Sequence, residues 1–343
     1  SQLWLPSFGL TADEIPELEA AVAAAREEGV DDLWTWGYEA CGHMTSLATP
    51  DAAQVWEAVS AALTGPRDPE ARATRELVTL MNVADATVAD AVAAAGDALA
   101  GAIDAVASRL AAGGRLVYVG AGTSGRLAAL DAAELGPTFG SPPGEVVAIV
   151  AGDGEDAEDD ADRGEAEIGT LAVGAQDAVV GISASGSTPF TLAALRAARA
   201  AGALCVAVVC ERDSSLGALA EHEVVLAVGP EVVSGSTRLK AGTAQKLALN
   251  ALSTVTMMRL GRTYAGLMVG VAPENAKLRE RARRNVVLAS GRSEEDVDVA
   301  LAAAGGDARV ALVSLLAGVD PATARERLEG AGGSVRLALG GAS

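Results

Sequence analysis

Aromatic side chains, histidine and cysteine are all scarce in this chain. Only 3% of its 343 residues are aromatic, and its two histidines are His43 and His222. So few histidines exclude a histidine-rich zinc centre and leave a Ser-His-Asp triad almost no candidates. The three cysteines, Cys41, Cys205 and Cys210, lack metal-site spacing and are odd in number. We therefore expect no metal, reduced thiols and a cytoplasmic location.

Positive charge is also in short supply. The chain has 26 Lys and Arg against 46 Asp and Glu, which gives a formal net charge of −20. Nucleic acids and anionic membrane surfaces need clustered cations, so neither is an expected partner. We find no uncharged apolar run of about 18 residues and no signal-peptide pattern, which favours a soluble intracellular protein.

The most informative segment is a glycine turn between a strand and a helix. Residues 116–119 are an apolar run typical of a buried parallel strand, and residues 120–126 (Gly-Ala-Gly-Thr-Ser-Gly-Arg) lead into a helical pattern. Free backbone N–H groups and the helix dipole favour an anion at such a turn. The glycine spacing is similar to a dinucleotide fingerprint, but Thr123 and Ser124 stand where a pyrophosphate needs close backbone approach. The turn therefore predicts a site for a phosphorylated small molecule.

A second strand, turn and helix follow the same scheme. After the apolar run 178–182, four hydroxyl side chains fall within six positions around a glycine: Ser183, Ser185, Ser187 and Thr188. Helix capping would explain one of them, but four exceed what a cap needs. A phosphate has three oxygens to satisfy, so these four are predicted phosphate ligands, with Thr123 and Ser124 nearby.

Strand and helix candidates alternate over most of the chain. Apolar runs predict strands at residues 115–120, 145–150, 178–183, 203–209 and 224–228, and long helices at 70–110 and 235–261. This order predicts a doubly wound parallel α/β sheet flanked by helices. Ligands of such sheets bind at the carboxyl ends of the strands, where both hydroxyl loops fall.

The chain is predicted to have three parts. Residues 1–65 form an N-terminal extension of unassigned role, with a helix at 15–29, an aromatic strand at 33–38 and a linker after it at 65–69. Residues 66–291 form the sugar-phosphate domain. Residues 292–343 form a small helical bundle, whose first helix is capped by Ser293.

A third polar segment, residues 229–246, contains Glu231, Arg238, Lys240 and Lys246 around a helix start. With the two hydroxyl loops and residues 275–279 (Asn-Ala-Lys-Leu-Arg), it makes the chain resemble the N-acetylmuramic acid 6-phosphate etherase family. That family has the sugar isomerase (SIS) fold and is related to the glucokinase regulatory protein. The likeness covers about residues 70–340.

The resemblance implies cleavage of the lactyl ether of N-acetylmuramic acid 6-phosphate by elimination and hydration, without metal or organic cofactor. It implies Glu134 as the acid and Glu155, in the acidic stretch 154–160, as the base. The segment before Glu155 is shorter than in the family, so Glu158 is an alternative base and loss of activity another outcome. A Thr-Glu-x-x-Asn-Pro stretch typical of the family is also missing before residue 70.

The resemblance further implies that Glu231 and Lys240 meet the sugar or its lactyl carboxylate, with Arg126 as the other candidate cation. A homodimer is expected, because the long helices have more apolar surface than one sheet face covers.

Two other functions stay open. A phosphosugar isomerase would favour a histidine, and His222 lies far from the loops in sequence. A non-catalytic sugar-phosphate sensor would fit the altered base loop and the missing N-terminal motif.

Overall fold

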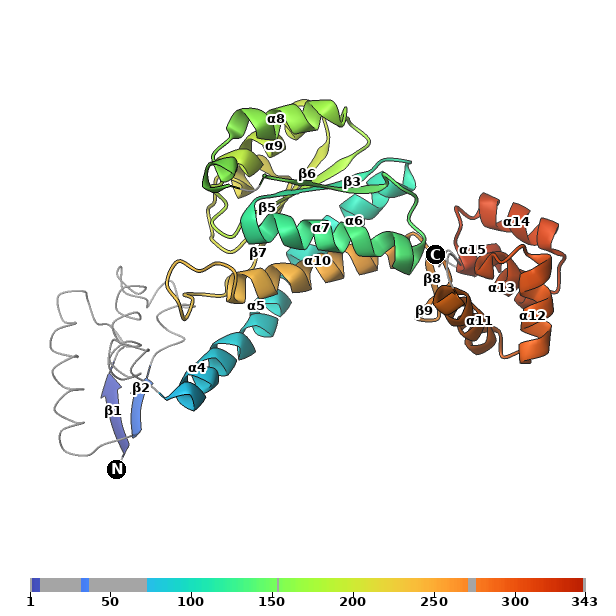
Figure 1. Ribbon diagram of the computed structural model, residues 1–343, viewed down its shortest axis with the longest axis horizontal. Helices are drawn as coiled ribbons and strands as arrows, with labels where there is room; N and C mark the ends of the chain where they lie inside the picture. Colours follow the sequence, from blue (N-terminus) through green and yellow to red (C-terminus); the bar gives the residue numbers. More distant parts are fainter. Residues whose placement is uncertain (1, 7–31, 37–72, 153, 271–275, 342–343) are drawn as a thin grey trace. The chain divides into compact units, whose positions relative to one another are not determined.

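The computed structural model describes residues 2–6, 32–36, 73–152, 154–270 and 276–341. The chain divides into two compact units, Ser1–Met81 and Asn82–Ser343, whose elements are labelled in Figure 1. In the first unit, β1 (Gln2–Pro6) pairs in parallel with β2 (Asp32–Trp36), which confirms a strand in the range 33–38. The predicted helix at 15–29 and the linker at 65–69 lie outside the described residues.

A parallel sheet of five strands forms the centre of the second unit (Figure 1). The strands are β3 (Leu116–Gly120), β4 (Val146–Val150), β5 (Ala178–Ile182), β6 (Leu204–Val209) and β7 (His222–Val225). Their spatial order is β4-β3-β5-β6-β7, and every neighbouring pair is parallel. The predicted doubly wound fold and its five strands are confirmed, although β7 begins and ends earlier than the range 224–228.

Helices cover both faces of this sheet (Figure 1). One layer contains α5 (Val88–Ala94), α6 (Gly96–Ala111), α7 (Gly122–Phe139) and α10 (Lys240–Arg259), and the other contains α8 (Ala161–Thr170) and α9 (Pro189–Ala200). Successive strand residues point to opposite faces. Leu116 and Tyr118 therefore join the core beneath α6, α7 and α10, whereas Val117 and Val119 join the core beneath α8 and α9. Burial on both faces explains the continuous apolar runs in the sequence.

Helix α4 (Thr74–Ala86) opens the long helical segment predicted at 70–110, and none of its residues is buried. Together with α5 it makes a stretch, Thr74–Ala94, that is long and apolar enough to cross a membrane by length and composition. Its second half packs on α10, where Val88 is 2% exposed, as in a core helix. The exclusion of a membrane partner stays a prediction.

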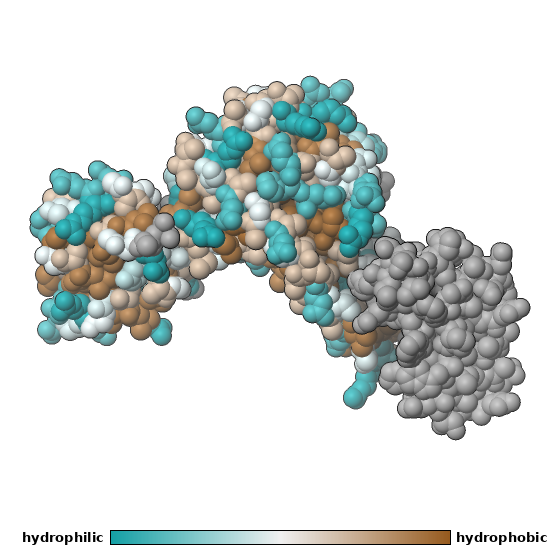
Figure 2. All heavy atoms as spheres, turned by 180° about the vertical axis from the view of Figure 1, so that it is seen from behind, coloured by the Kyte–Doolittle hydropathy of each residue, from teal (hydrophilic) through white to brown (hydrophobic). Residues whose placement is uncertain are grey.

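The C-terminal helices build an apolar core of their own. They are α11 (Ala276–Ser290), α12 (Glu294–Ala303), α13 (Ala308–Ala317), α14 (Pro321–Gly330) and α15 (Val335–Ala338). Ser293 Oγ accepts the backbone N–H of Asp296 at 3.2 Å, which confirms the predicted cap. Apolar residues also reach the surface (Figure 2), and on these helices they include Leu288 and Val299. Because α11 shares this core with α12 and α13, the bundle includes a helix that precedes residue 292; the three domain boundaries stay predictions.

Candidate functional site

The two hydroxyl loops follow neighbouring strands. β3 and β5 pair from Leu116 and Ala178 at one end to Gly120 and Ile182 at the other. After β3 the chain crosses to β4 on one side and then returns to β5 on the other. The topological switch point of the sheet therefore lies between β3 and β5, and ligands of open α/β sheets bind at such a point. The fold brings together the two loops that the sequence predicts as phosphate sites.

Glycines allow α7 to begin directly against the end of β3. A Cβ on Gly125 would lie 2.5 Å from the carbonyl oxygen of Gly120, so only hydrogen fits there. Gly122, the first residue of α7, has a φ of +51°, which favours glycine. The free N–H groups of the first helical turn are thus held at the carboxyl edge of the sheet.

Thr123 and Ser124 lie in this first turn and have different surroundings. Ser124 is buried, and its Oγ donates a hydrogen bond to Gln245 Oε1 of α10 at 2.9 Å. Thr123 is half-buried, and its Oγ1 accepts a hydrogen bond from Arg126 at 3.3 Å. Ser124 therefore anchors the turn to α10, while Thr123 and the backbone N–H groups remain the better placed donors for an anion.

The second loop is a network of hydroxyl groups. Ser183 Oγ lies 2.9 Å from Thr188 Oγ1 and accepts the N–H of Gly186 at 3.0 Å, and Ser187 Oγ donates to Ser185 Oγ at 2.9 Å. Thr188 stands at the N-cap of α9 but makes no side-chain capping bond, so capping does not account for it. Ser185 and Ser187 are exposed. The loop and the start of α9 together offer the donors that a phosphate requires.

A cavity of about 580 Å³ opens beside the second loop. Its wall includes Ser185 from the loop, Cys210 and Arg212 after β6, and Glu231 and Thr237 from the third polar segment. This volume is in the range of small-molecule sites. The segment 229–246 therefore contributes one wall of the candidate site.

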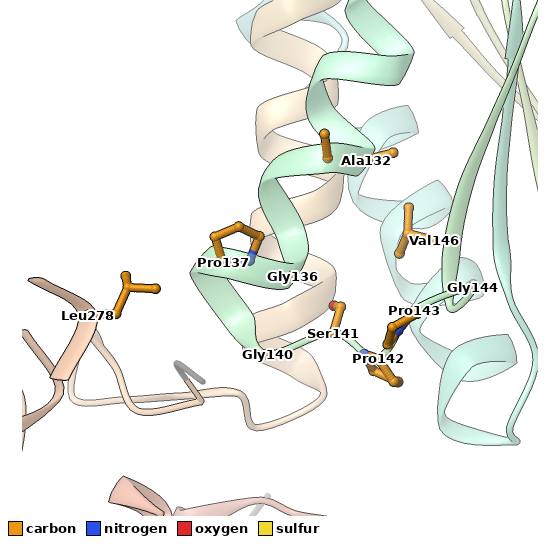
Figure 3. A pocket seen from close by; sticks show the side chains of 11 residues that line it. Ala132, Gly136, Pro137, Gly140, Ser141, Pro142, Pro143, Gly144, Val146 and Leu278 are labelled. Atoms are coloured by element: carbon orange, nitrogen blue, oxygen red, sulfur yellow. The ribbon is translucent and has the colours of Figure 1, made fainter. Parts of the chain in front are cut away.

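Another cavity, of about 420 Å³, lies at the C-terminal end of α7 (Figure 3). Its wall includes Gly136 and Pro137 from the helix, residues 140–144 from the following loop, and Leu278. The described residues that line it include no charged side chain, and Ser141 is their single hydroxyl. A phosphate would find few partners there, so the 580 Å³ cavity beside the second loop is the better candidate of these two for a sugar-phosphate site.

Glu231 and Lys240 make structural contacts that sequence reasoning missed. The two carboxylate oxygens of Glu231 accept the backbone N–H groups of Lys240 and Ala241, at 3.0 Å each. Lys240 is 7% exposed, and its Nζ donates to the carbonyl oxygen of Val228 at 2.6 Å. Burial lowers the pKa of Lys240, and the nearby Glu231 charge opposes that shift. Both residues fix the start of α10, and a substrate contact by either stays a prediction.

Replacing Glu231 by alanine is expected to lower the free energy of unfolding by about 1–2 kcal/mol, because two N–H groups of α10 lose their acceptor. Urea unfolding measures this change. The same substitution at Glu165, which is exposed on α8, is the control and should leave stability near that of the wild type. Equal stability of the two variants would show that the cap contributes nothing.

Glu134 lies in the fourth turn of α7, beside a buried polar cluster. Its side chain is 62% exposed, and its Oε2 lies 4.0 Å from Lys246 Nζ of α10. Lys246 Nζ also lies 3.6 Å from Oδ1 of the buried Asp131. The hydroxyls of Tyr118 and Ser253 donate to Asp131 at 3.0 and 3.3 Å. Burial raises the pKa of Asp131, and these hydrogen bonds and the Lys246 charge oppose the shift. A fixed carboxylate thus holds a lysine next to Glu134.

Glu134 is distant from the hydroxyl loops of its own chain. Gly122 and Glu134 are twelve residues apart on α7, which corresponds to about 18 Å along the helix axis. The structure therefore does not bring the predicted acid and the predicted phosphate ligands together within one chain.

The acidic stretch after β4 brings one glutamate to the first turn of α7. Glu155 begins the short 3-10 helix η3 (Glu155–Glu158), and its side chain lies outside the described part. Glu158 ends η3, and its Oε1 would lie 2.5 Å from a Cβ on Gly122. Glu158 is thus the carboxylate placed at the first anion turn. The sequence contains one indication of this difference. The segment before Glu155 is shorter than in the family, so the sequence alone did not determine which of the two glutamates lies at the turn.

His222 is the first residue of β7. It therefore lies at the amino edge of the sheet, opposite the hydroxyl loops. Its imidazole would lie 3.6 Å from a Cβ on Gly101 of α6, so it packs on a helix. This position does not support histidine-based isomerase chemistry at the loops.

The thiols of Cys205 and Cys210 are expected to be unreactive in the folded protein. Burial raises the pKa of each thiol to about 12, so little thiolate exists at pH 8. In a Cys41→Ser background, we expect disulfide-exchange labelling at pH 8 to be about a thousandfold slower than for free cysteine. Labelling should become fast in guanidinium chloride. Fast labelling of either thiol without denaturant would contradict the expectation.

Comparison with known proteins places these features in a family. Residues 98–199 match the glucokinase regulatory protein N-terminal SIS domain, and residues 162–255 match the SIS domain. A solved structure, that of a phosphoheptose isomerase from Francisella tularensis, is similar with a TM-score of 0.42 and 18% identity, over 53% of this chain and 98% of that one.

Two curated relatives are much more similar in sequence. N-acetylmuramic acid 6-phosphate etherase of Rubrobacter xylanophilus is 54% identical over 274 residues, which cover 78% of this chain and 90% of the relative. The Streptomyces avermitilis protein of the same name is 52% identical over 276 residues, which cover 78% and 89%. Because about half of the aligned residues are identical over most of both lengths, the chain belongs to the N-acetylmuramic acid 6-phosphate etherase family.

Proposed function

We propose that this protein cleaves the lactyl ether of N-acetylmuramic acid 6-phosphate in the recycling of cell-wall sugars. The products are D-lactate and N-acetylglucosamine 6-phosphate. The observation that carries the proposal is that two donor-rich loops follow the paired strands β3 and β5, at one switch point, in a chain that belongs to this family. The described residues show no feature that supports an isomerase or a sensor as strongly as these two loops support the etherase.

The phosphate is bound by the second loop and the start of α9. Ser185 and Ser187 are exposed there, and Ser183 and Thr188 hold the turn that presents them. Thr123 and the N-terminal N–H groups of α7 lie after the neighbouring strand and supply further donors. The sugar then extends into the 580 Å³ cavity.

The reaction is a balanced elimination and hydration on the open-chain sugar. A base removes the proton from C2, a double bond forms between C2 and C3, and the bond from C3 to the ether oxygen breaks. An acid gives its proton to that oxygen, and lactate leaves. Water then adds its hydroxide to C3 and its proton to the former acid, and the former base returns a proton to C2. One water is consumed overall, and both groups are restored.

Glu158 is the base in this proposal. Its carboxylate lies beside Gly122 in the first turn of α7, next to the first anion turn, whereas the resemblance alone pointed to Glu155. The two residues are three positions apart, at opposite ends of η3, and positions three apart in a 3-10 helix lie on the same side of it. Glu155 stays the alternative.

Glu134 is the acid, and the proposal requires a second copy of the chain. In a hexose 6-phosphate only three carbons and one oxygen separate C3 from phosphorus, a span much shorter than the roughly 18 Å between Gly122 and Glu134 along α7.

Leu130, one turn before Glu134, is 47% exposed, and Leu247 on the packed helix α10 is 40% exposed. We infer a homodimer in which this apolar face packs on the partner, so that Glu134 serves the partner's loops. Sedimentation analysis should give twice the chain mass.

Lactate release tests the proposed function. Purified protein is incubated with N-acetylmuramic acid 6-phosphate, D-lactate is measured enzymatically, and the sugar product is identified by NMR. Binding of the sugar without lactate would indicate a sensor, and interconversion of hexose phosphates an isomerase.

A cytoplasmic location is part of the proposal, since Cys205 and Cys210 are free thiols. Fractionation of the source cells checks it.

A further inference from the structure

Lys246 carries a buried ammonium group that the described residues leave without a hydrogen bond. Its Nζ lies 3.6 Å from Asp131 Oδ1 and 4.0 Å from Glu134 Oε2, both longer than a hydrogen bond. An ammonium without close acceptors is costly to bury. Asp131 is 3% exposed and held by two hydroxyls, so it is fixed in place. Glu134 is largely exposed and free to move aside.

The chemistry of the proposed substrate places a second carboxylate close to the acid. In the lactyl group, the carbon that bears the ether oxygen also bears the carboxylate. An acid that protonates this oxygen must lie within hydrogen-bond distance of it. A cation that binds the carboxylate must therefore lie within a few ångströms of the same acid. Lys246 Nζ lies at such a distance from Glu134.

The other candidate cations are occupied or misplaced. Lys240 is buried and donates its Nζ hydrogen to the Val228 carbonyl oxygen. Arg126 donates to Thr123 Oγ1 at 3.3 Å in the first turn of α7, so its guanidinium is engaged at the turn where the proposal places the phosphate. Lys240 and Arg126, the two cations selected from the sequence, therefore already have hydrogen-bond partners, whereas Lys246 has none among the described residues and lies beside the acid.

We propose that Lys246 binds the lactyl carboxylate of the substrate and so sets the specificity of the site for an acidic ether substituent. This inference rests on the proposed function, with Glu134 as the acid. The incoming carboxylate replaces Glu134 as the neighbour of the ammonium, and Asp131 keeps the lysine in position. The negative charge then placed beside Glu134 favours its protonated form, the form that a general acid must have.

The test compares N-acetylmuramic acid 6-phosphate with its lactyl carboxamide, which has the same shape but no charge. Formation of N-acetylglucosamine 6-phosphate, the common product, gives kcat/KM for both. Calorimetry in a Glu158→Gln background, which should bind both sugars without cleaving them, gives both affinities. We expect the wild type to prefer the acid about 10- to 100-fold, as for a charge-assisted hydrogen bond. Lys246→Met and Lys246→Gln should reduce this ratio to near one, and Lys246→Arg should keep most of it.

The matched control is Arg259→Met, which removes an exposed cation of α10 that pairs with Asp104. Its ratio should equal that of the wild type. A purely structural role of Lys246 would weaken both substrates equally, and an unchanged ratio in Lys246→Met, by kinetics and by calorimetry, would overturn the inference. Failure of the wild type to release lactate would instead refute the proposed function, while the calorimetric ratio would still decide the role of Lys246.

Discussion

Replacing Glu158 by glutamine is expected to reduce lactate release by about a thousandfold. The amide of glutamine has nearly the shape of the carboxylate but does not accept the C2 proton, and general base catalysis contributes about 10²- to 10⁴-fold. Exchange of the C2 hydrogen with D₂O, followed by NMR, reports the same step and should slow in parallel. Sugar binding should persist, because the hydroxyl loops after β3 and β5 are unchanged.

Glu155→Gln is the matched control for this prediction, since it alters the other end of the same short helix. We expect its turnover to stay within a few-fold of the wild type. If Glu155→Gln abolishes C2 exchange and Glu158→Gln does not, the base is Glu155 and the position of Glu158 beside Gly122 is incidental. Loss of activity in both variants without loss of exchange would exclude either residue as the base.

The parts of the fold that the sequence predicted are those with a local signal. The strands of the sheet are buried on both faces, so each appears as an apolar run, and the helix after each loop has a cap or a glycine turn. The position of Thr123 and of the hydroxyls of residues 183–188 could be predicted because ligand loops follow the carboxyl ends of such strands; their binding of a phosphate stays a prediction. Pairing of β3 with β5 then put both loops at one switch point.

The directions of individual polar side chains had no such local signal. The sequence predicts Glu231 and Lys240 as ligands, and it does not indicate that the folded chain also uses them to cap and anchor α10. Ser124 is turned inward by Gln245, which lies 121 positions away in sequence. The neighbourhood of Glu134 depends equally on a distant residue, because Lys246 comes from α10. Contacts between helices and strands that are far apart in the sequence determine these roles, so the spacing of residues along the chain does not predict them.

Replacing Glu134 by glutamine is expected to reduce lactate release by about a thousandfold, with C2 exchange largely retained. The amide does not protonate the departing ether oxygen, whereas removal of the C2 proton needs only the base. A separation of exchange from elimination would therefore assign Glu134 to the acid role. Loss of exchange as well would indicate that Glu134 acts earlier in the reaction than proposed.

The same variant tests whether each site is shared between two chains. Glu134→Gln and Glu158→Gln are each expected to be nearly inactive alone. After subunit exchange, half of the dimers contain one chain of each kind, and in those dimers one of the two sites has both an intact Glu158 and an intact Glu134 from the partner. Activity should then return to about a quarter of the wild-type value. If both glutamates of a site came from one chain, every site in every mixed dimer would lack one of them, and mixing would restore nothing.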